Sequence, residues 1–488
     1  DSAHLPIIAN ERCGVPATVH LLHCSNTAEP LQEDPLHTDA IVVGAGFAGL
    51  RTAQRLVAAG RTVTVLEARD RVGGRICPGE IAGRTIDLGG MWLGPTQRRL
   101  DELTSQIGMK RYPTWLQGEC SIEFRGRFGR APGEDFDRIL GTPNRLRLLK
   151  LNWELERLCK NLPVSAPWDH PKAAELDAQT VASWTAQRTA SPDVHHLMNL
   201  VCQAVFCTEA RELSLLYFAF YCKAAGGLLV LLAGGPGGAQ NFLFDGGLHQ
   251  AARHLADGIE AEIALDAPVV AVEQTENHVT VTTAGGESRT ASRLVMAVPP
   301  PLAREITWAP GLSQDRARLL ERQTMGSTIK GWLAYERPFW REDNHNAFVM
   351  TDASAFSPAF DATPPGSTIG LIAGFFESVE GRSVAESTPE VRREIAITTL
   401  VRHLGARAAD PIDYIDKDWT AEQWSRGCYG ATMPPGVLTT VGHLMRKPLG
   451  RVHWAGTETA TEWSGYVEGA LESGDRAARE VLAGLRGR

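Results

Sequence analysis

The sequence predicts an α/β fold with more than one domain, and three observations support this prediction. The chain has 488 residues, more than one ordinary hydrophobic core accommodates. Its composition, 43% hydrophobic and 22% charged, is that of a globular protein. Residues 39–67 follow the pattern strand, glycine-rich turn, helix, strand, which is typical of the first unit of a parallel sheet.

The turn of this first unit predicts a dinucleotide site. The apolar residues 39–45 are expected to form a buried strand, and Gly44, Gly46 and Gly49 follow it and open a helix. Such glycines let backbone N–H groups at a helix N-terminus reach a pyrophosphate. Glu67 ends the next strand, where its carboxylate can accept hydrogen bonds from ribose hydroxyls. A glycine turn in another kind of α/β protein is the alternative.

The segment that follows Glu67 favours FAD over NAD. Residues 67–75 contain three arginines and two adjacent glycines. Arg71 and Arg75 can neutralise phosphates, and the glycine pair lets the backbone come close to them. A nicotinamide site does not usually need this second set of groups. A solvated charged loop is the alternative.

Helical patterns dominate the middle of the chain, and strand patterns follow them. Helical spacing is clearest at residues 152–162 and 213–224, within a largely helical stretch from about 113 to 244. The apolar residues 228–232 lie between glycine-dense stretches, which predict a mobile loop or a close backbone approach. The later expected elements are strands at 268–273, 278–283, 293–298 and 331–335, a hairpin turn at 285–286, a break at the prolines 299–301 and a helix at 465–485.

Charge and composition exclude several classes of function. The net charge of −8 argues against a nucleic-acid partner. The nine cysteines are scattered and odd in number, which favours free thiols in a reducing compartment, and no CxxC pair suggests a metal site. No apolar run approaches the roughly 20 residues of a membrane span. We therefore expect no membrane partner and a cytoplasmic location, with a peroxisomal one left open, and residues 1–38 are expected to form an N-terminal arm.

The chain resembles the flavin-containing monoamine oxidase family from about residue 39 to residue 479. The resemblance rests on motifs at residues 44–49, 67–75, 87–90, 94–97, 326–330, 338–341, 425–429, 455–461 and 463–466. It implies a GR2-type flavoprotein, with a Rossmann-like FAD-binding domain and an interleaved α+β substrate domain. The implied FAD-binding segments are 39–112, 245–319 and 422–488, and the implied substrate-domain segments are 113–244 and 320–421.

The resemblance also implies which residues contact FAD. They are Gly44, Gly46, Phe47, Ala48, Gly49, Glu67, Ala68, Arg69, Arg75, Gly89, Gly90, Met91, Trp92, Val269, Trp419, Cys428, Tyr429, Gly456, Glu458, Gly465, Tyr466 and Val467. Val269 is expected to contact adenine through its backbone. Structural packing explains Trp419 equally well.

Catalytic roles are implied for three residues. Tyr429 and Tyr466 match an aromatic cage that holds the amine nitrogen over the flavin, and Lys330 matches a lysine that holds a water near flavin N5 and assists oxygen reduction. Gln240 matches a glutamine that touches substrate. The alternatives are ordinary core tyrosines and a lysine at the surface end of a strand.

Cys428 matches a cysteine that carries the flavin through a thioether to its 8α carbon. The sequence departs from the family pattern beside it, because Arg426 stands where we expect a glycine. An ordinary buried cysteine is the alternative.

The implied activity is oxidation of a primary amine, with O2 as the electron acceptor and H2O2 as a product. Amino acid oxidases need a cation for the substrate carboxylate, and residues 89–97 contain no arginine. Diamine or polyamine oxidation of the putrescine type stays open, although polyamine oxidases usually lack the paired tyrosines. A flavin desaturase and a non-catalytic flavin-bearing interaction protein are the other classes. The expected partners are a small-molecule amine and O2, and a homodimer is left open.

Overall fold

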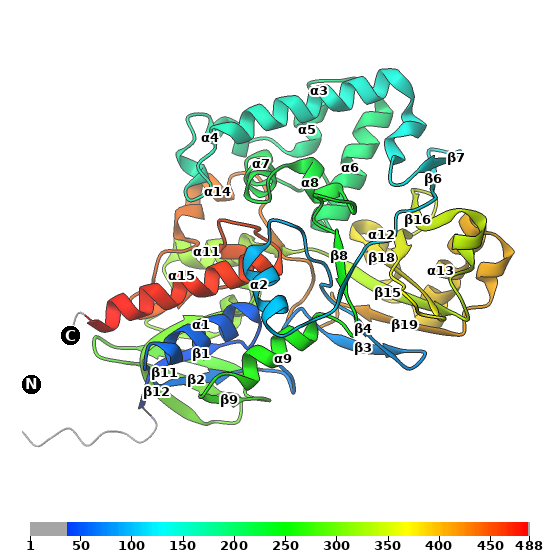
Figure 1. Ribbon diagram of the computed structural model, residues 1–488. Coiled ribbons are helices and arrows are strands. Elements are labelled where there is room, and N and C mark those ends of the chain that lie inside the picture. Colours follow the sequence, from blue (N-terminus) through cyan, green and yellow to red (C-terminus); the bar gives the residue numbers. More distant parts are fainter. Residues whose placement is uncertain (1–36, 487–488) are drawn as a thin grey trace, which may run out of the picture. The chain divides into compact units, whose positions relative to one another are not determined.

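The computed structural model describes residues 37–486. The N-terminal arm predicted at residues 1–38 therefore lies outside the described residues, except for His37 and Thr38, which begin strand β1 (His37–Val43). The described residues form an eight-stranded sheet and a seven-stranded sheet. Figure 1 shows both sheets with their helices and a group of helices around α3.

The eight-stranded sheet joins three segments that lie far apart in the sequence. Its strand order is β13-β10-β11-β12-β1-β2-β9, and β21 pairs with β12. β1 pairs in parallel with β2 and β12, whereas β10, β11 and β12 form an antiparallel meander. The strands after β1 are β2 (Val63–Leu66), β9 (Glu262–Ala264), β10 (Val269–Gln274), β11 (Val279–Thr283), β12 (Ser288–Met296), β13 (Thr307–Ala309) and β21 (Val452–Trp454). Because parallel strands end at the same edge, the turns after β1, β2 and β12 lie together.

Helices α1 (Phe47–Ala58), α9 (His249–Asp257) and α15 (Val467–Arg486) pack on this sheet through one hydrophobic cluster. α1 and α15 approach closely because Gly474 has no side chain. A Cβ atom there would lie 2.6 Å from the carbonyl oxygen of Ala48. α1 begins directly after the glycine turn, so its N-terminus faces that turn.

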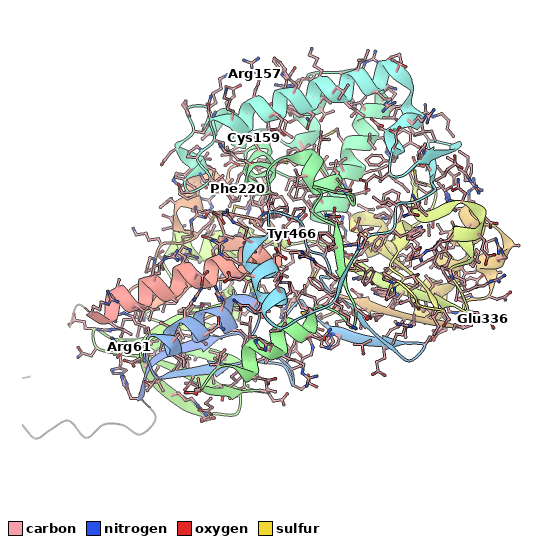
Figure 2. The ribbon with its side chains drawn as sticks, in the orientation of Figure 1. Arg61, Arg157, Cys159, Phe220, Glu336 and Tyr466 are labelled. Carbon is pink, nitrogen blue, oxygen red and sulfur yellow. The ribbon has the colours of Figure 1, made fainter. Side chains whose placement is uncertain are left out.

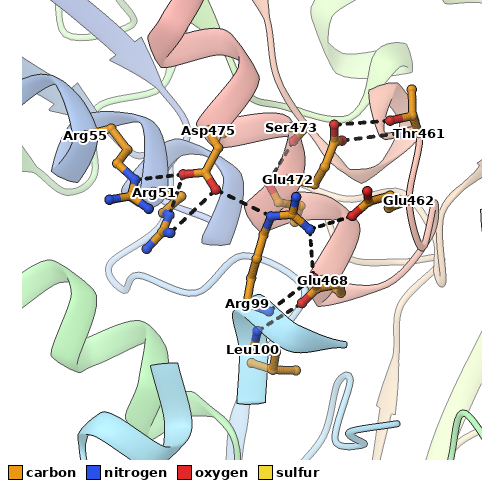
Figure 3. A network of polar contacts seen from close by, with 12 residues as sticks. Arg51, Arg55, Arg99, Leu100, Thr461, Glu462, Glu468, Glu472, Ser473 and Asp475 are labelled. Atoms are coloured by element: carbon orange, nitrogen blue, oxygen red, sulfur yellow. Dashed lines mark hydrogen bonds and ion pairs between the residues drawn. The ribbon is translucent and has the colours of Figure 1, made fainter. Parts of the chain in front are cut away.

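A polar network holds the N-terminal half of α15 in place (Figure 3). Asp475 accepts hydrogen bonds from Arg51 and Arg55 of α1, each at 2.8 Å. Arg99, in helix α2 (Arg98–Gln106), lies 2.9 Å from Glu468 and 3.5 Å from Asp475. The network thus fixes the segment that leads into α15.

The seven-stranded sheet has the order β19-β15-β18-β17-β16-β6-β7. Its strands are β6 (Glu119–Phe124), β7 (Arg127–Pro132), β15 (Thr328–Tyr335), β16 (His345–Thr351), β17 (Phe356–Asp361), β18 (Gly370–Glu377) and β19 (Asp413–Asp418). β15 and β18 are buried at every position, since helices α12 (Ser378–Ala385) and α13 (Pro389–Leu404) pack beside this sheet.

The helical group surrounds α7 (Leu215–Ala224), which is apolar on all sides and buried along most of its length. Its other members are α3 (Gly141–Lys160), α4 (Ala173–Asp177), α5 (Val181–Ala186), α6 (Pro192–Phe206) and α8 (Leu228–Leu232) (Figure 1). The remaining elements are short: β3 (Pro78–Ile81), β4 (Arg84–Asp87), β5 (Arg111–Pro113), β8 (Phe242–Phe244), α10 (Pro300–Glu305), α11 (Gln314–Arg322), β14 (Thr324–Met325), β20 (Ala431–Thr432) and α14 (Val437–Val441).

The elements expected from the sequence are present, with shifted ends. The structure adds two details. Leu228–Leu232 forms the short helix α8, because its apolar side chains pack against α6 and α7. Of the two alternatives left open for this stretch, the close backbone approach is present, since a Cβ at Gly238 would lie 2.0 Å from the carbonyl oxygen of Ala233. The prolines after β12 begin α10 as well as ending the strand, since a first helical turn needs no N–H from proline. Between residues 37 and 486, no helix is both long and apolar enough to cross a membrane.

Candidate active site

A cavity of about 550 Å³ extends from the glycine turn to the helical group. Its volume lies in the range of about 300–1,000 Å³ that is common for ligand sites. Every cofactor, catalytic and substrate residue expected from the sequence lines this cavity except Gly49, Arg71 and Glu458. The structure therefore brings together residues that lie more than 400 positions apart in the chain.

The glycine turn forms one end of the cavity with backbone alone. Gly44 has a φ of +103°, and Gly44, Gly46 and Gly74 line the wall there. Gly49, which is also expected to contact FAD, does not line this wall. A Cβ at Gly49 would be 1.8 Å from the carbonyl oxygen of Gly44, so this glycine lets α1 pack against the turn.

Glu67 lies beside the glycine turn, as the sequence predicts for a ribose-binding acid. Its Oε2 accepts a hydrogen bond from the Ala45 N–H at 2.7 Å, and its Oε1 accepts one from the Arg69 N–H at 3.1 Å. The side chain is buried and lines the cavity. These bonds fix the carboxylate at the end of β2.

The two arginines assigned to phosphates have different positions. Arg71 does not line the cavity, and its guanidinium donates to the carbonyl oxygens of Val72, Gly74 and Ile76. Arg71 thus closes its own loop, and its contact with a phosphate stays a prediction. Arg75 does line the cavity and donates to Glu458.

Glu458, which the resemblance places among the FAD contacts, does not line the cavity and lies behind Arg75. The pair is bidentate, with distances of 2.5 Å and 3.1 Å. Burial by itself raises the pKa of Glu458, but the Arg75 guanidinium more than offsets this and holds it below the ordinary range. Arg75 also donates to the carbonyl oxygen of Tyr429 at 2.9 Å, so it joins the glycine-turn side of the cavity to the Cys428–Tyr429 loop.

Lys330 is fully buried on β15, which excludes the surface lysine that the sequence left open. Its Nζ donates to the carbonyl oxygen of Gly89 at 2.8 Å and lies 2.7 Å from the sulfur of Met91. The rings of Trp92, Trp332 and Phe375 surround it at 5.2–5.9 Å. Burial lowers the pKa of its ammonium group to about 7, although Asp87 acts in the opposite direction.

Tyr429 and Cys428 follow one another on the loop opposite Lys330, and the peptide bond between them is cis. The Tyr429 ring packs edge-on against Phe375, with 5.9 Å between ring centroids. Its hydroxyl donates to Glu377 at 2.5 Å. The Cys428 thiol is buried, and burial raises its pKa to about 12 while Arg75 and Arg69 act in the opposite direction.

Tyr466, which is labelled in Figure 2, lies just before α15. It lines the same cavity. Its ring packs against Trp463 at 5.0 Å and against Tyr221 at 6.3 Å. Gly465, just before it, has a φ of +86°, and a Cβ there would lie 2.2 Å from the Tyr221 hydroxyl. Only glycine therefore fits at this position.

Gln240 lines the cavity from the side of the helical group. Its side-chain Nε2 donates to the carbonyl oxygen of Leu231 at 3.1 Å. Its backbone carbonyl oxygen accepts a hydrogen bond from the Thr114 hydroxyl. Trp419 lies near Gly89 and donates from Nε1 to the carbonyl oxygen of Leu88 at 2.9 Å. Trp419 both packs in a hydrophobic cluster and lines the cavity.

Sequence reasoning missed three residues at or beside this cavity. Tyr221 lines it but belongs to an apolar helix in which it looks like an ordinary core residue. Glu134 lines it from an irregular segment, and Glu377 lies behind Tyr429. Nothing in the local sequence distinguishes either glutamate from an ordinary surface glutamate, so the sequence carried no sign that they belong to the site.

The cavity fits FAD. Its glycine-walled end lies at the N-terminus of α1, whose partial positive charge suits a pyrophosphate. A Cβ at Gly46 would meet its nearest atom only at 3.9 Å, so this glycine faces open space. Among the described residues, Trp92 Nε1 and Thr328 Oγ1 are buried polar atoms without a hydrogen-bond partner, and both residues line the cavity. Such atoms suit a polar ligand.

The match to known families covers most of the chain. A model of the family described as flavin containing amine oxidoreductase matches residues 47–482. The chain belongs to the flavin-containing amine oxidoreductase family. This confirms the resemblance and the α/β FAD-binding fold predicted from the sequence, and the cofactor is FAD.

Relatives in this family share the length of the chain as well as its sequence. Human amine oxidase (flavin-containing) B is 34% identical over 456 residues, which cover 91% of this chain and 86% of the relative. The structure of cyclohexylamine oxidase from Brevibacterium oxydans is 33% identical, with a TM-score of 0.86. That of putrescine oxidase bound to putrescine is 29% identical, with a TM-score of 0.87. Both structures are covered to 99%, and each covers 92% of this chain.

Proposed function

We propose that this chain oxidises primary amines to imines, which water hydrolyses to an aldehyde and ammonia, while O2 is reduced to H2O2. One observation supports this most: Lys330, Cys428, Tyr429 and Tyr466 line a single cavity that the glycine turn closes at its other end. The relatives named above are amine oxidases, which agrees with this proposal.

The side chains of the cavity have separate tasks in this reaction. FAD, when bound, supplies the hydride acceptor. Apolar walls, including Leu200, Val201 and Phe348, desolvate the substrate and so favour loss of its ammonium proton, whose pKa in water is about 10.4. Tyr429 and Tyr466 orient the nitrogen, and Lys330 holds a water for oxygen reduction. The domain boundaries given above and these residue roles stay predictions.

Adding a primary amine to the purified yellow protein without oxygen should bleach its flavin absorbance. Admitting oxygen should restore the colour and release one H2O2 per amine oxidised, because the electrons leave through O2. A screen of monoamines and diamines by H2O2 release measures both. A flavin that no primary amine bleaches contradicts the proposal.

A diamine is the second candidate substrate, and one carboxylate favours it. Of the three carboxylate side chains that line the cavity among the described residues, Glu67 lies at the glycine turn and Glu305 pairs with Arg426. The third is Glu134, which accepts hydrogen bonds from the N–H groups of Gly234 and Gly235. An ionised carboxylate there can attract the second ammonium group of a diamine.

The same screen distinguishes this candidate through the variant Glu134→Gln. If a diamine is the substrate, the variant should raise KM for the diamine about tenfold and leave KM for a monoamine of equal length unchanged. Equal changes for the two substrates would show that Glu134 only holds the glycine loop.

We also propose that Cys428 carries the flavin through a thioether. Its position on the cavity wall beside Tyr429 supports this proposal. Acid precipitation of the protein should then leave the yellow colour in the pellet, whereas the variant Cys428→Ala should release FAD into the supernatant. As a control, Cys222→Ala removes a buried thiol that does not line the cavity, and its pellet should stay yellow. A colourless wild-type pellet is the contrary outcome.

A further inference from the structure

Glu377 is a buried carboxyl group directly behind Tyr429. It is the last residue of β18, is 4% exposed and does not line the cavity. The Tyr429 hydroxyl donates to its Oε1 at 2.5 Å. Any effect of Glu377 on a bound amine must therefore pass through Tyr429.

Strand β18 holds Tyr429 at two points. Phe375 and Glu377 lie two residues apart, so their side chains point to the same face of the strand. Phe375 contacts the Tyr429 ring at an interplanar angle of 78°, and Glu377 binds its hydroxyl. Together they fix both the plane of the ring and the direction of its O–H bond.

Among residues 37–486, the groups that face Glu377 carry no positive charge. They are Tyr429 on its loop, Glu380 on α12 and the thiol of Cys207 after α6, while Thr328 lies opposite on β15. Burial raises the pKa of Glu377 to about 8, the Tyr429 hydrogen bond acts against this, and Glu380 adds to it. At neutral pH the carboxyl group therefore keeps its proton.

We propose that Glu377 is a positioning residue of the amine site, and that the site binds its substrate with one proton shared between the amine nitrogen and the Glu377 carboxyl group. This inference rests on the amine oxidation proposed above. If the amine and the Glu377 carboxyl group together held two ionisable protons, an ammonium ion would lie in an apolar cavity without a counter-charge. If the two groups held no such proton, the Glu377 carboxylate would be buried without a cation. Only the state with one proton has no net charge.

The proton count predicts how affinity depends on pH. Below about pH 8 the free site holds the Glu377 proton and the free amine is an ammonium ion, so binding releases one proton to solvent. Affinity then rises tenfold for each pH unit. Above about pH 8 Glu377 is already ionised, the ammonium brings the single proton, and affinity levels off.

An amine that cannot react measures this directly. tert-Butylamine has no hydrogen on the carbon next to nitrogen, so it binds without turnover, and its Kd follows from the flavin absorbance of the holoenzyme. For the wild type we expect a break near pH 8. For Glu377→Gln, which has no ionisable group, the break should move to the amine pKa of about 10.4. At about pH 9 the variant should bind about tenfold more tightly than the wild type, if the two match at neutral pH.

Two further variants separate positioning from general damage. Glu386→Gln changes an exposed glutamate at the end of α12 and should leave the break near pH 8. Glu377→Leu removes the acceptor of the Tyr429 hydroxyl and should lower kcat/KM about tenfold. In a Tyr429→Phe background, the same change should have little further effect, because the hydroxyl is already absent.

A wild-type affinity that rises through pH 8 without a break overturns the inference, and so does a Glu377→Gln variant that keeps the break. Neither result bears on amine oxidation, which bleaching of the flavin by reactive amines tests separately. If no amine bleaches the wild type, the proposed function fails first. The wild-type titration stands by itself even if a variant does not fold.

Discussion

The variant Lys330→Met is expected to slow the reaction of the reduced enzyme with O2 about a hundredfold, an effect typical of losing one preorganised polar group. Lys330 holds its amino group inside a ring of three aromatic side chains next to Gly89 and Met91, and methionine keeps its length without the polar group. Stopped-flow mixing of the amine-reduced enzyme with oxygenated buffer measures the rate. Reduction by the amine and retention of FAD should change much less.

Lys417→Met is the matched control for this prediction. Lys417 lies on β19 directly opposite Lys330, but it pairs with Glu422 and does not line the cavity. Its loss should leave the oxygen rate unchanged. If Lys330→Met reacts with oxygen as fast as this control, Lys330 has no part in oxygen reduction.

Arg75→Met is expected to lower the free energy of unfolding by about 3–5 kcal/mol, because it leaves Glu458 buried without its cation. Glu458 is buried, and the two hydrogen bonds from Arg75 are its charged contacts. The variant also loses the bond from Arg75 to Tyr429, so FAD binding should weaken with stability. Urea denaturation followed by tryptophan fluorescence, together with the FAD content after gel filtration, measures both effects.

Two variants show whether the buried charge is the cause. Arg55→Met removes a half-exposed partner of Asp475 and should cost at most about 1 kcal/mol. The double variant Arg75→Met with Glu458→Gln removes the unpaired charge as well and should recover part of the loss. If Arg75→Met is as stable as Arg55→Met, an unpaired buried charge on Glu458 is not the cause of the loss.

Local patterns account for the parts of the fold that the sequence predicted well. The strand, glycine turn and helix around Gly44 depend on contacts within about 30 residues, which is the length of one βαβ unit. Their apolar periods and glycine positions can be read directly, and β1, α1 and β2 are found where they were expected. The family motifs indicated Lys330, Tyr429 and Tyr466 as site residues, and the structure shows that all three line one cavity.

The sequence could not distinguish side chains or elements whose partners come from distant segments. Arg71 and Arg75 look equivalent in the sequence, four residues apart in one charged loop. They differ only because Glu458, 383 residues after Arg75, takes one of them as a buried ion pair. The helix α8 similarly depends on contacts with α6 and α7 rather than on its own five residues.

The sequence alone determined the cofactor and the chemical class of this protein, because glycine spacing, strand ends and a few motif residues encode them locally. The tertiary structure decided which charges are paired, which are buried and what stands behind each functional side chain. Glu377 is the clearest case, since its effect on an amine depends on burial and on a hydroxyl from residue 429, and neither is visible along the chain.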